Sequence, residues 1–168
     1  TIKNNTVQLN GFVTVKNDST VIKETDTVYS ITGGEVTVVL DKKTGNLVTT
    51  RNTANDYVLS FNNGPVLVKG TAAVVSSRSY KEGTNSAVEF TYSGNMKYVR
   101  WKINASGWTT MEYEYSLEGD QPFAGISFNY PENYILSSRW LGKGPVRQWK
   151  NRLAGTPVNV WQNIYNNS

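Results

Sequence analysis

Short stretches in which apolar and polar residues alternate recur along the chain, and turns rich in Gly, Asn and Ser separate them. A period of two is that of a β-strand, whose side chains point to opposite faces of a sheet in turn. The alternating stretches predict strands over 35–40, 47–50, 66–68, 72–78, 87–92, 98–103 and 109–117. No segment keeps apolar residues at helical spacing, so we expect almost no helix. The pattern predicts an all-β fold, an antiparallel sandwich or barrel.

Two of these stretches allow a more detailed prediction. The segment 36–40 is followed by the turn Asp41–Asn46 and then by 47–50, which together predict a hairpin. In the segment 110–117 the alternation separates two faces. Met111, Tyr113, Tyr115 and Leu117 are expected to pack on the core, and Thr110, Glu112, Glu114 and Ser116 to face water or a groove.

The start of the chain differs in character from the rest. Residues 1–24 are expected to form an N-terminal hairpin or the tail of a preceding domain, with 22–27 as a linker. Residues 25–168 are then expected to form the β-sandwich domain.

The chain contains neither cysteine nor histidine. Disulfides, thiolate zinc sites, cysteine nucleophiles and catalytic sites that need an imidazole are therefore excluded. The glycine-rich signatures of nucleotide-binding loops are also missing. We accordingly expect no cofactor and no metal ion.

The net charge of +4 is concentrated near the C-terminus. From Asn133 onward the chain has no carboxylate, while five cations fall there, namely Arg139, Lys143, Arg147, Lys150 and Arg152. Motifs of nucleic-acid-binding folds are missing, and no apolar run approaches the roughly 20 residues of a membrane span. We expect neither nucleic acid nor a membrane as a partner, although binding of another polyanion to the cationic segment stays open, with steep salt dependence as its sign.

The segment 140–152 is the most unusual part of the sequence, because two Trp, four cations and two amides gather around Gly142, Gly144 and Pro145. The glycines and the proline predict a loop. An indole can stack on the C–H face of a sugar ring, and Arg, Asn and Gln can hydrogen-bond its hydroxyls. The alternative is structural: both Trp residues would belong to the core, and the cations would form a solvated rim or pack on the indoles.

Glu112 and Glu114 form the other candidate for chemistry, since they lie two apart on one face of a predicted strand. Glycosidases use paired carboxylates that flank the bond from opposite sides, whereas neighbours at i and i+2 project in parallel. A solvated face is the simpler interpretation of this pair.

Four segments resemble the C-terminal small domain of glycoside hydrolase family 2 β-galactosidases. Residues 36–47 are similar to the opening hairpin of that domain, and 124–134 to a strand and loop that precede its substrate-facing run. The segments 140–145 and 149–155 resemble that run, which reads [YW]-x-G-[RK]-G-P-H-E-N-Y-x-D-R. The resemblance implies a galactose-mutarotase-like supersandwich, present here in shortened form or completed by another segment.

The chain departs from the family run at residues 146–151, where Val-Arg-Gln-Trp-Lys-Asn replaces His-Glu-Asn-Tyr-x-Asp. Both carboxylates and the imidazole are gone, and the added charge of Arg147 and Lys150 favours acidic or heavily hydroxylated sugars. In the family, the catalytic carboxylates belong to a separate barrel domain, and the small domain closes the site. The resemblance therefore implies a domain that does not hydrolyse a glycoside alone.

We thus expect a non-catalytic carbohydrate-binding accessory domain of a larger glycoside hydrolase. Its partners would be galactose- or uronic-acid-containing oligosaccharides or polysaccharides and the catalytic domain of the same parent chain. The expected sugar contacts are Arg147, Trp149, Asn151 and Arg152, with Trp140 and Trp161 as further platforms. Arg152 has an equal alternative role, bracing the loop through backbone carbonyls. The resemblance also implies a bacterial, extracellular or periplasmic protein.

Two other functions stay open at this point. The chain could be a structural spacer that packs on a catalytic domain. It could also be a mutarotase-like or lyase-like enzyme remnant that uses Glu112, Glu114 or tyrosines as acid and base.

Overall fold

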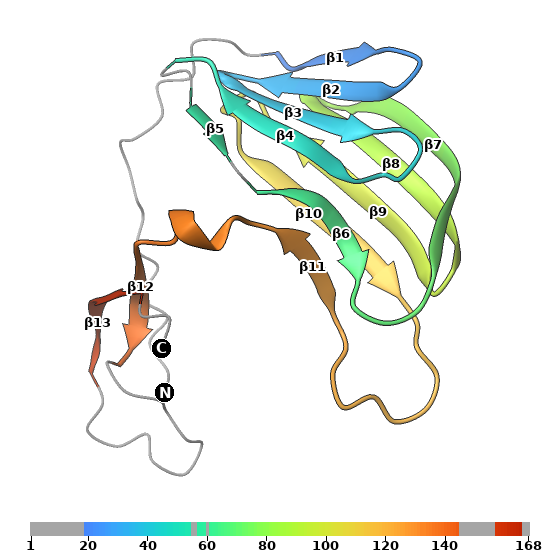
Figure 1. The fold of residues 1–168 in the computed structure, drawn as a ribbon. Helices are drawn as coiled ribbons and strands as arrows, with labels where there is room; N and C mark the ends of the chain where they lie inside the picture. The colour runs from blue at the N-terminus through green and yellow to red at the C-terminus, as the bar shows by residue number, and fades with distance from the viewer. Residues whose placement is uncertain (1–18, 55–56, 60, 145–156, 166–168) are drawn as a thin grey trace, which may run out of the picture. The chain divides into compact units, whose positions relative to one another are not determined.

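The computed structural model describes residues 19–54, 57–59, 61–144 and 157–165 (Figure 1). The chain divides into two compact units, residues 1–129 and 130–168, and each is described by itself. In the described residues almost all regular structure is β, and the only helical element is the short 3₁₀ turn η1 (Glu132–Tyr134). The prediction of an all-β, antiparallel fold with almost no helix is confirmed.

The first unit contains two antiparallel sheets that face each other (Figure 1). The five-stranded sheet has the order β1-β2-β3-β4-β5. Its strands are β1 (Val21–Glu24), β2 (Val28–Gly33), β3 (Val36–Asp41), β4 (Leu47–Asn52) and β5 (Tyr57–Leu59). The four-stranded sheet has the order β10-β9-β8-β7. Its strands are β7 (Ala72–Glu82), β8 (Asn85–Gly94), β9 (Met96–Ile103) and β10 (Thr109–Tyr115). A short pair, β6 (Asn62–Leu67) with β11 (Ile126–Asn129), completes the unit.

Strand β7 lies at an edge of the four-stranded sheet and carries one extra residue. Val74 pairs with Tyr92 and Ser76 pairs with Thr91, so Val75 has no partner on β8 and forms a β-bulge. The side chain of Val75 is exposed. Because the bulge takes up one extra residue of β7, the residues of β7 on both sides of it remain paired with residues of β8 that point to the same face of the sheet.

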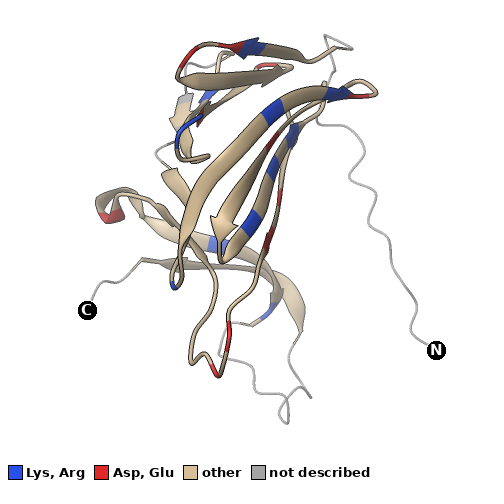
Figure 2. Ribbon diagram, turned by 90° about the vertical axis from the view of Figure 1, so that its right-hand side faces the viewer, with Lys and Arg blue, Asp and Glu red and all other residues tan. Residues whose placement is uncertain are grey.

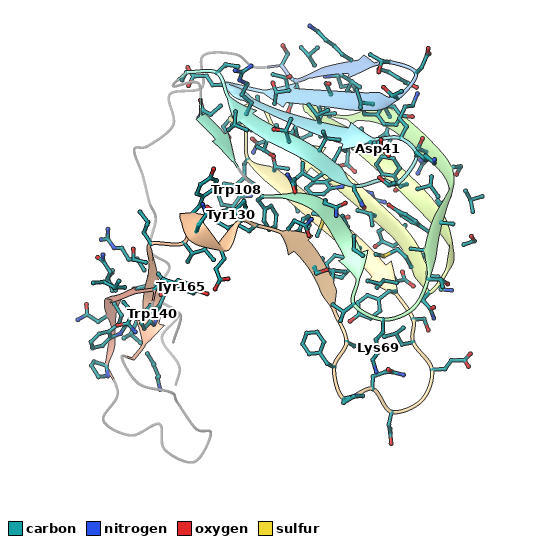
Figure 3. All side chains as sticks on the ribbon, viewed as in Figure 1. Asp41, Lys69, Trp108, Tyr130, Trp140 and Tyr165 are labelled. Atoms are coloured by element: carbon teal, nitrogen blue, oxygen red, sulfur yellow. The ribbon has the colours of Figure 1, made fainter. Side chains whose placement is uncertain are left out.

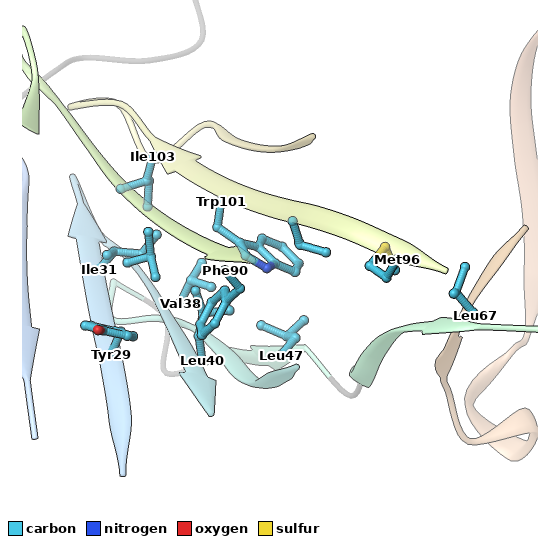
Figure 4. Packing of buried hydrophobic residues seen from close by; sticks show 12 residues of the cluster. Tyr29, Ile31, Val38, Leu40, Leu47, Leu67, Phe90, Met96, Trp101 and Ile103 are labelled. Atoms are coloured by element: carbon cyan, nitrogen blue, oxygen red, sulfur yellow. The ribbon is translucent and has the colours of Figure 1, made fainter. Parts of the chain in front are cut away.

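Alternate residues of the two sheets form one continuous core (Figure 4). The five-stranded sheet contributes Tyr29, Ile31, Val38, Leu40 and Leu47, and the four-stranded sheet contributes Val88, Phe90, Met96, Val99, Trp101 and Ile103. The ring of Phe90 is fully buried and meets the ring of Tyr29 edge-on, with 6.0 Å between the centroids. The period-two pattern of the sequence thus builds a sandwich with one shared interior.

Every predicted strand overlaps an observed one, but the alternation pattern did not predict β1, β2, β5 and β11 of the first unit. Two further expectations for this unit are wrong. Residues 22–27, expected as a linker, include most of β1, which pairs with β2 from Val21↔Thr32 to Glu24↔Tyr29. Tyr113, expected in the core, is exposed and stacks in parallel on Tyr115 instead. Because β10 is an edge strand, the opposite sheet does not cover all of its inner face.

The β9–β10 turn, residues 104–108, is held by one side chain. The Oδ1 atom of Asn104 accepts hydrogen bonds from the backbone N–H groups of Ser106 and Trp108, both at 3.0 Å, and from the Ser106 hydroxyl at 2.8 Å. The amide side chain thereby satisfies donors that the turn leaves without backbone partners. The indole of Trp108 projects from this fixed backbone and is 74% exposed.

Removal of that acceptor should cost about 1 kcal/mol of the free energy of unfolding. We expect this for Asn104→Ala, measured by urea denaturation at constant slope. Asn104→Asp keeps an oxygen at the same place and should cost less than half as much. Equal losses in the two variants would contradict the role assigned to the Asn104 oxygen.

The second unit is built around a hairpin of β12 (Ser137–Lys143) and β13 (Val158–Ile164). Seven residue pairs align in antiparallel register, from Ser137↔Ile164 to Lys143↔Val158. The backbone N–H of Tyr165 donates to the Leu136 carbonyl, which extends the pairing beyond the strand ends. In the described residues there is no helix of the length and apolar character that crossing a membrane requires.

Candidate functional site

Trp140 and Trp161, both expected as sugar platforms, face each other across the hairpin of the second unit. They form a directly opposed cross-strand pair, so their side chains lie on the same face of the two strands. Trp140 therefore stands on a strand, and the prediction that the segment from residue 140 is a loop is wrong for 140–143. The reason is the register with β13, which pairs every residue of β12.

Trp161 is fixed in place by its neighbours. Its indole Nε1–H donates to the carbonyl of Gly142 at 3.0 Å. A side chain at Gly144 would come within 2.9 Å of the indole carbon Cδ1, so the buried Gly144 leaves room for the ring. Trp161 and Trp140 are both partly buried rather than sunk in an interior. The Trp161 ring is thus held by the hairpin, and both indole rings stay partly open to solvent.

Small polar residues flank the tryptophan pair on the same face. Strand alternation places Ser138 and Asn163 next to the pair on one side, and Gly142 and Asn159 on the other. The Asn159 side chain accepts from the N–H of Val160 at 2.8 Å. The face therefore combines two indoles with hydroxyl and amide groups.

The opposite face of the same hairpin is exposed and carries both aliphatic and polar side chains. Its residues include Leu141, Val158, Val160 and Ile164, with exposed fractions between 49% and 84%. Arg139 and Lys143 share this face by alternation. Four large aliphatic side chains are thus exposed on one small hairpin.

Four predicted contact residues, Arg147, Trp149, Asn151 and Arg152, lie outside the described residues.

Glu112 and Glu114 lie on the outer face of β10, as predicted, but in different surroundings. Glu112 accepts from Arg100 at 3.0 Å between Oε2 and Nη1. It ends a row of four charged residues that runs straight across the sheet, Arg78–Glu89–Arg100–Glu112, each directly opposite the next. Figure 2 shows blue and red bands of basic and acidic residues on the strands of the four-stranded sheet. The engaged Glu112 is part of a structural row.

Glu89 is the centre of this row. Arg78 donates to its Oε1 from Nε at 3.0 Å and from Nη2 at 2.6 Å. Arg100 donates to its Oε2 from Nε at 2.9 Å, and the Nη2 atom of Arg100 lies 2.8 Å from the same oxygen as an ion pair. Burial of the Glu89 carboxyl raises its pKa, but the hydrogen bonds from Arg100 and Arg78 outweigh burial, and the net pKa lies below that of an ordinary glutamate. Sequence reasoning missed this row, although alternation in 87–92 already places Glu89 on the face opposite Val88 and Phe90.

Two hollows adjoin the β3–β4 turn, which the sequence predicted as a turn only. The Asp41 carboxylate accepts from the backbone N–H and the hydroxyl of Thr44, at 2.7 and 2.8 Å (Figure 3). Lys43, Thr44 and Asn46 line both hollows, one of about 640 Å³ and the other of about 420 Å³. The larger one has the size of a small-ligand site.

The described residues contain no group of three or more acidic side chains that could hold a metal ion. Comparisons of the chain with models of known protein families and with curated proteins found no match.

Proposed function

We propose that this chain is a non-catalytic carbohydrate-binding accessory domain of a larger glycoside hydrolase. The observation that carries the proposal is the directly opposed pair Trp140 and Trp161 on one face of the β12–β13 hairpin, partly exposed and flanked by polar side chains. Each indole offers a flat surface for the C–H face of a sugar ring, and Ser138 and Asn163 stand beside it with a hydroxyl and an amide.

Fixed geometry favours binding by this pair. The hydrogen bond from Trp161 Nε1 to Gly142 holds one ring before a ligand arrives, so little side-chain entropy is lost on binding. Arg147 and Lys150, which lie outside the described residues, would add a preference for acidic or heavily hydroxylated sugars if they reach the same ligand. In the proposed role the partner is a galactose- or uronic-acid-containing saccharide, and the protein is extracellular or periplasmic.

The first test is calorimetric titration with galactan and oligogalacturonate fragments. Trp140→Ala should weaken binding about tenfold, because a stacked aromatic contributes on the order of 1.4 kcal/mol. Trp108→Ala removes an equally large, 74% exposed indole from the first unit and should leave binding unchanged. Binding that is insensitive to Trp140→Ala, or equally sensitive to Trp108→Ala, would refute the assignment of the hairpin as the site.

The second candidate function is that of a spacer that packs on a catalytic domain. It is favoured by the exposed aliphatic side chains on the other face of the hairpin, Leu141, Val158, Val160 and Ile164. Two results together would favour the spacer over sugar binding. No glycan would give a measurable heat of titration, and the chain would capture the parent catalytic domain in a way that Val160→Ser abolishes.

A further inference from the structure

The larger hollow beside the β3–β4 turn has the walls of a ligand site. It measures about 640 Å³ and lies between the turn, the β6–β7 connection and the start of β7. Six aliphatic residues line it, Pro65, Val66, Leu67, Ala72, Ala73 and Val74. Pro65 and Leu67 are buried, and the others are at least partly open to solvent. The hollow therefore offers an apolar surface to a ligand of a few carbon atoms.

Polar groups enter the hollow from the side of the turn. Tyr92 lines it, and the Tyr92 hydroxyl donates to the Thr44 carbonyl at 3.3 Å, which fixes the turn over the ring. Burial raises the pKa of Tyr92, so its hydroxyl stays protonated. A side chain at Gly45 would overlap that hydroxyl, and the positive φ of 74° also suits glycine there. The turn is thus rigidly placed, and it brings Lys43 and Asn46 to the hollow.

Among the described residues, Lys43 is the only charged one that lines this hollow. Its neighbour Lys42 is paired with Glu24 at 2.6 Å, whereas no carboxylate among the described residues lies within ion-pair distance of Lys43. Asp41 lines the smaller hollow, and its Oδ1 is taken by the two donors of Thr44. The larger hollow is therefore lined by an apolar wall and by one exposed lysine without a carboxylate partner among the described residues, a combination that suits an organic anion.

We propose that this hollow binds a small organic carboxylate, with the carboxylate on Lys43 and the carbon skeleton against Val66, Ala73 and Val74. The site is separate from the tryptophan pair and does not depend on the proposed function. A short fatty acid and a uronic acid share the carboxylate but differ in the polarity of the carbon skeleton, so both are tested.

The experiment follows backbone amide resonances of the intact chain during titration with hexanoate and with glucuronate at low salt. At least one acid should shift Val66 and Val74 saturably. Lys43→Met keeps the stem and removes the charge, and should weaken binding about fivefold, as expected for one partly exposed ion pair. Lys69→Met makes the same change at an exposed lysine that does not line the hollow, and should have no effect.

Further arms decide what is recognised. Hexanol lacks the carboxylate and therefore tests the contribution of charge, and inorganic phosphate lacks a carbon skeleton and therefore tests the contribution of the apolar wall. Each should bind more weakly than the acid that binds best. Ala73→Phe fills the hollow from an exposed position and should abolish the shifts. Two results would overturn the proposal: neither acid shifts these amides, or the acids bind equally well to Lys43→Met. Binding of phosphate as tight as that of the acids would overturn it too.

Discussion

Replacement of Gly33 by alanine is expected to lower the free energy of unfolding by about 3 kcal/mol. Gly33 ends β2, and an added methyl group would overlap the backbone carbonyl oxygen of Asn104 and come within 3.0 Å of the Ile103 side chain. Both obstacles are rigid, because Ile103 is fully buried and Asn104 is fixed in its turn. The two sheets would have to separate at this end.

Gly83→Ala is the matched control for this prediction. Gly83 has a positive φ of 61°, but no atom lies within 4 Å of the methyl group that alanine would add. Its cost is conformational only, about 1 kcal/mol. Urea denaturation of the two variants separates steric from conformational cost. If Gly33→Ala costs no more than Gly83→Ala, the close approach of the β2–β3 and β9–β10 turns is not as tight as described.

Replacement of Glu89 by glutamine should lower the free energy of unfolding by about 2 kcal/mol. The change keeps the volume and removes the charge that pairs with Arg78 and Arg100, which leaves the less exposed Arg100 without its main partner. The Arg78 side chain is 68% exposed, so its share of the loss is small. Among the described residues Glu114 has no such pair, so Glu114→Gln, on the same face of the sheet, should change stability by less than about 0.5 kcal/mol. Equal losses would show that the row contributes nothing specific.

Comparison of the native chain with Glu89→Gln should also reveal a pH dependence of stability. Because the pKa of Glu89 is lowered by folding, its stabilising effect is present above the ordinary glutamate range and is lost as the pH falls through the folded pKa. The difference in stability between the native chain and Glu89→Gln should therefore be full at pH 7 and shrink below about pH 4. A stability difference that stays constant down to pH 3 would mean that ionisation of Glu89 does not stabilise the folded chain.

Local patterns were sufficient to predict most strands. The segments 36–40 and 47–50 form a hairpin as expected, because alternation and the Asp41–Asn46 turn agree at the local level. Strand β1 was missed because the polar residues Lys23, Glu24 and Thr25 resemble a linker, and only the pairing with β2 makes this stretch a strand. Tyr113 was misplaced because alternation gives the face of a residue but not the extent to which that face is covered.

The candidate sites were harder to predict. Sequence composition singled out Trp140 and Trp161, but it did not predict that they stand opposite each other. The two residues are 21 positions apart, and the register that aligns them is a property of the pair of strands. The larger hollow could not be predicted, because its lining comes from the β3–β4 turn, β6, β7 and β8. Alternation could have placed Glu89 on the outer face of its strand. It could not have identified the two arginine partners, because they come from different neighbouring strands.

The irregularity at Val75 has a consequence for how this protein behaves at high concentration. Strand β7 ends its sheet, and its N-terminal half carries small, uncharged side chains from Ala72 to Ser77. Such an edge is a template for the strand of another molecule. The extra residue interrupts the regular spacing of amide and carbonyl groups there, so an incoming strand would match it over only a few residues before losing step. Deletion of Val75 would remove this interruption, and fibrous or amorphous aggregates should then form more readily than from the native chain.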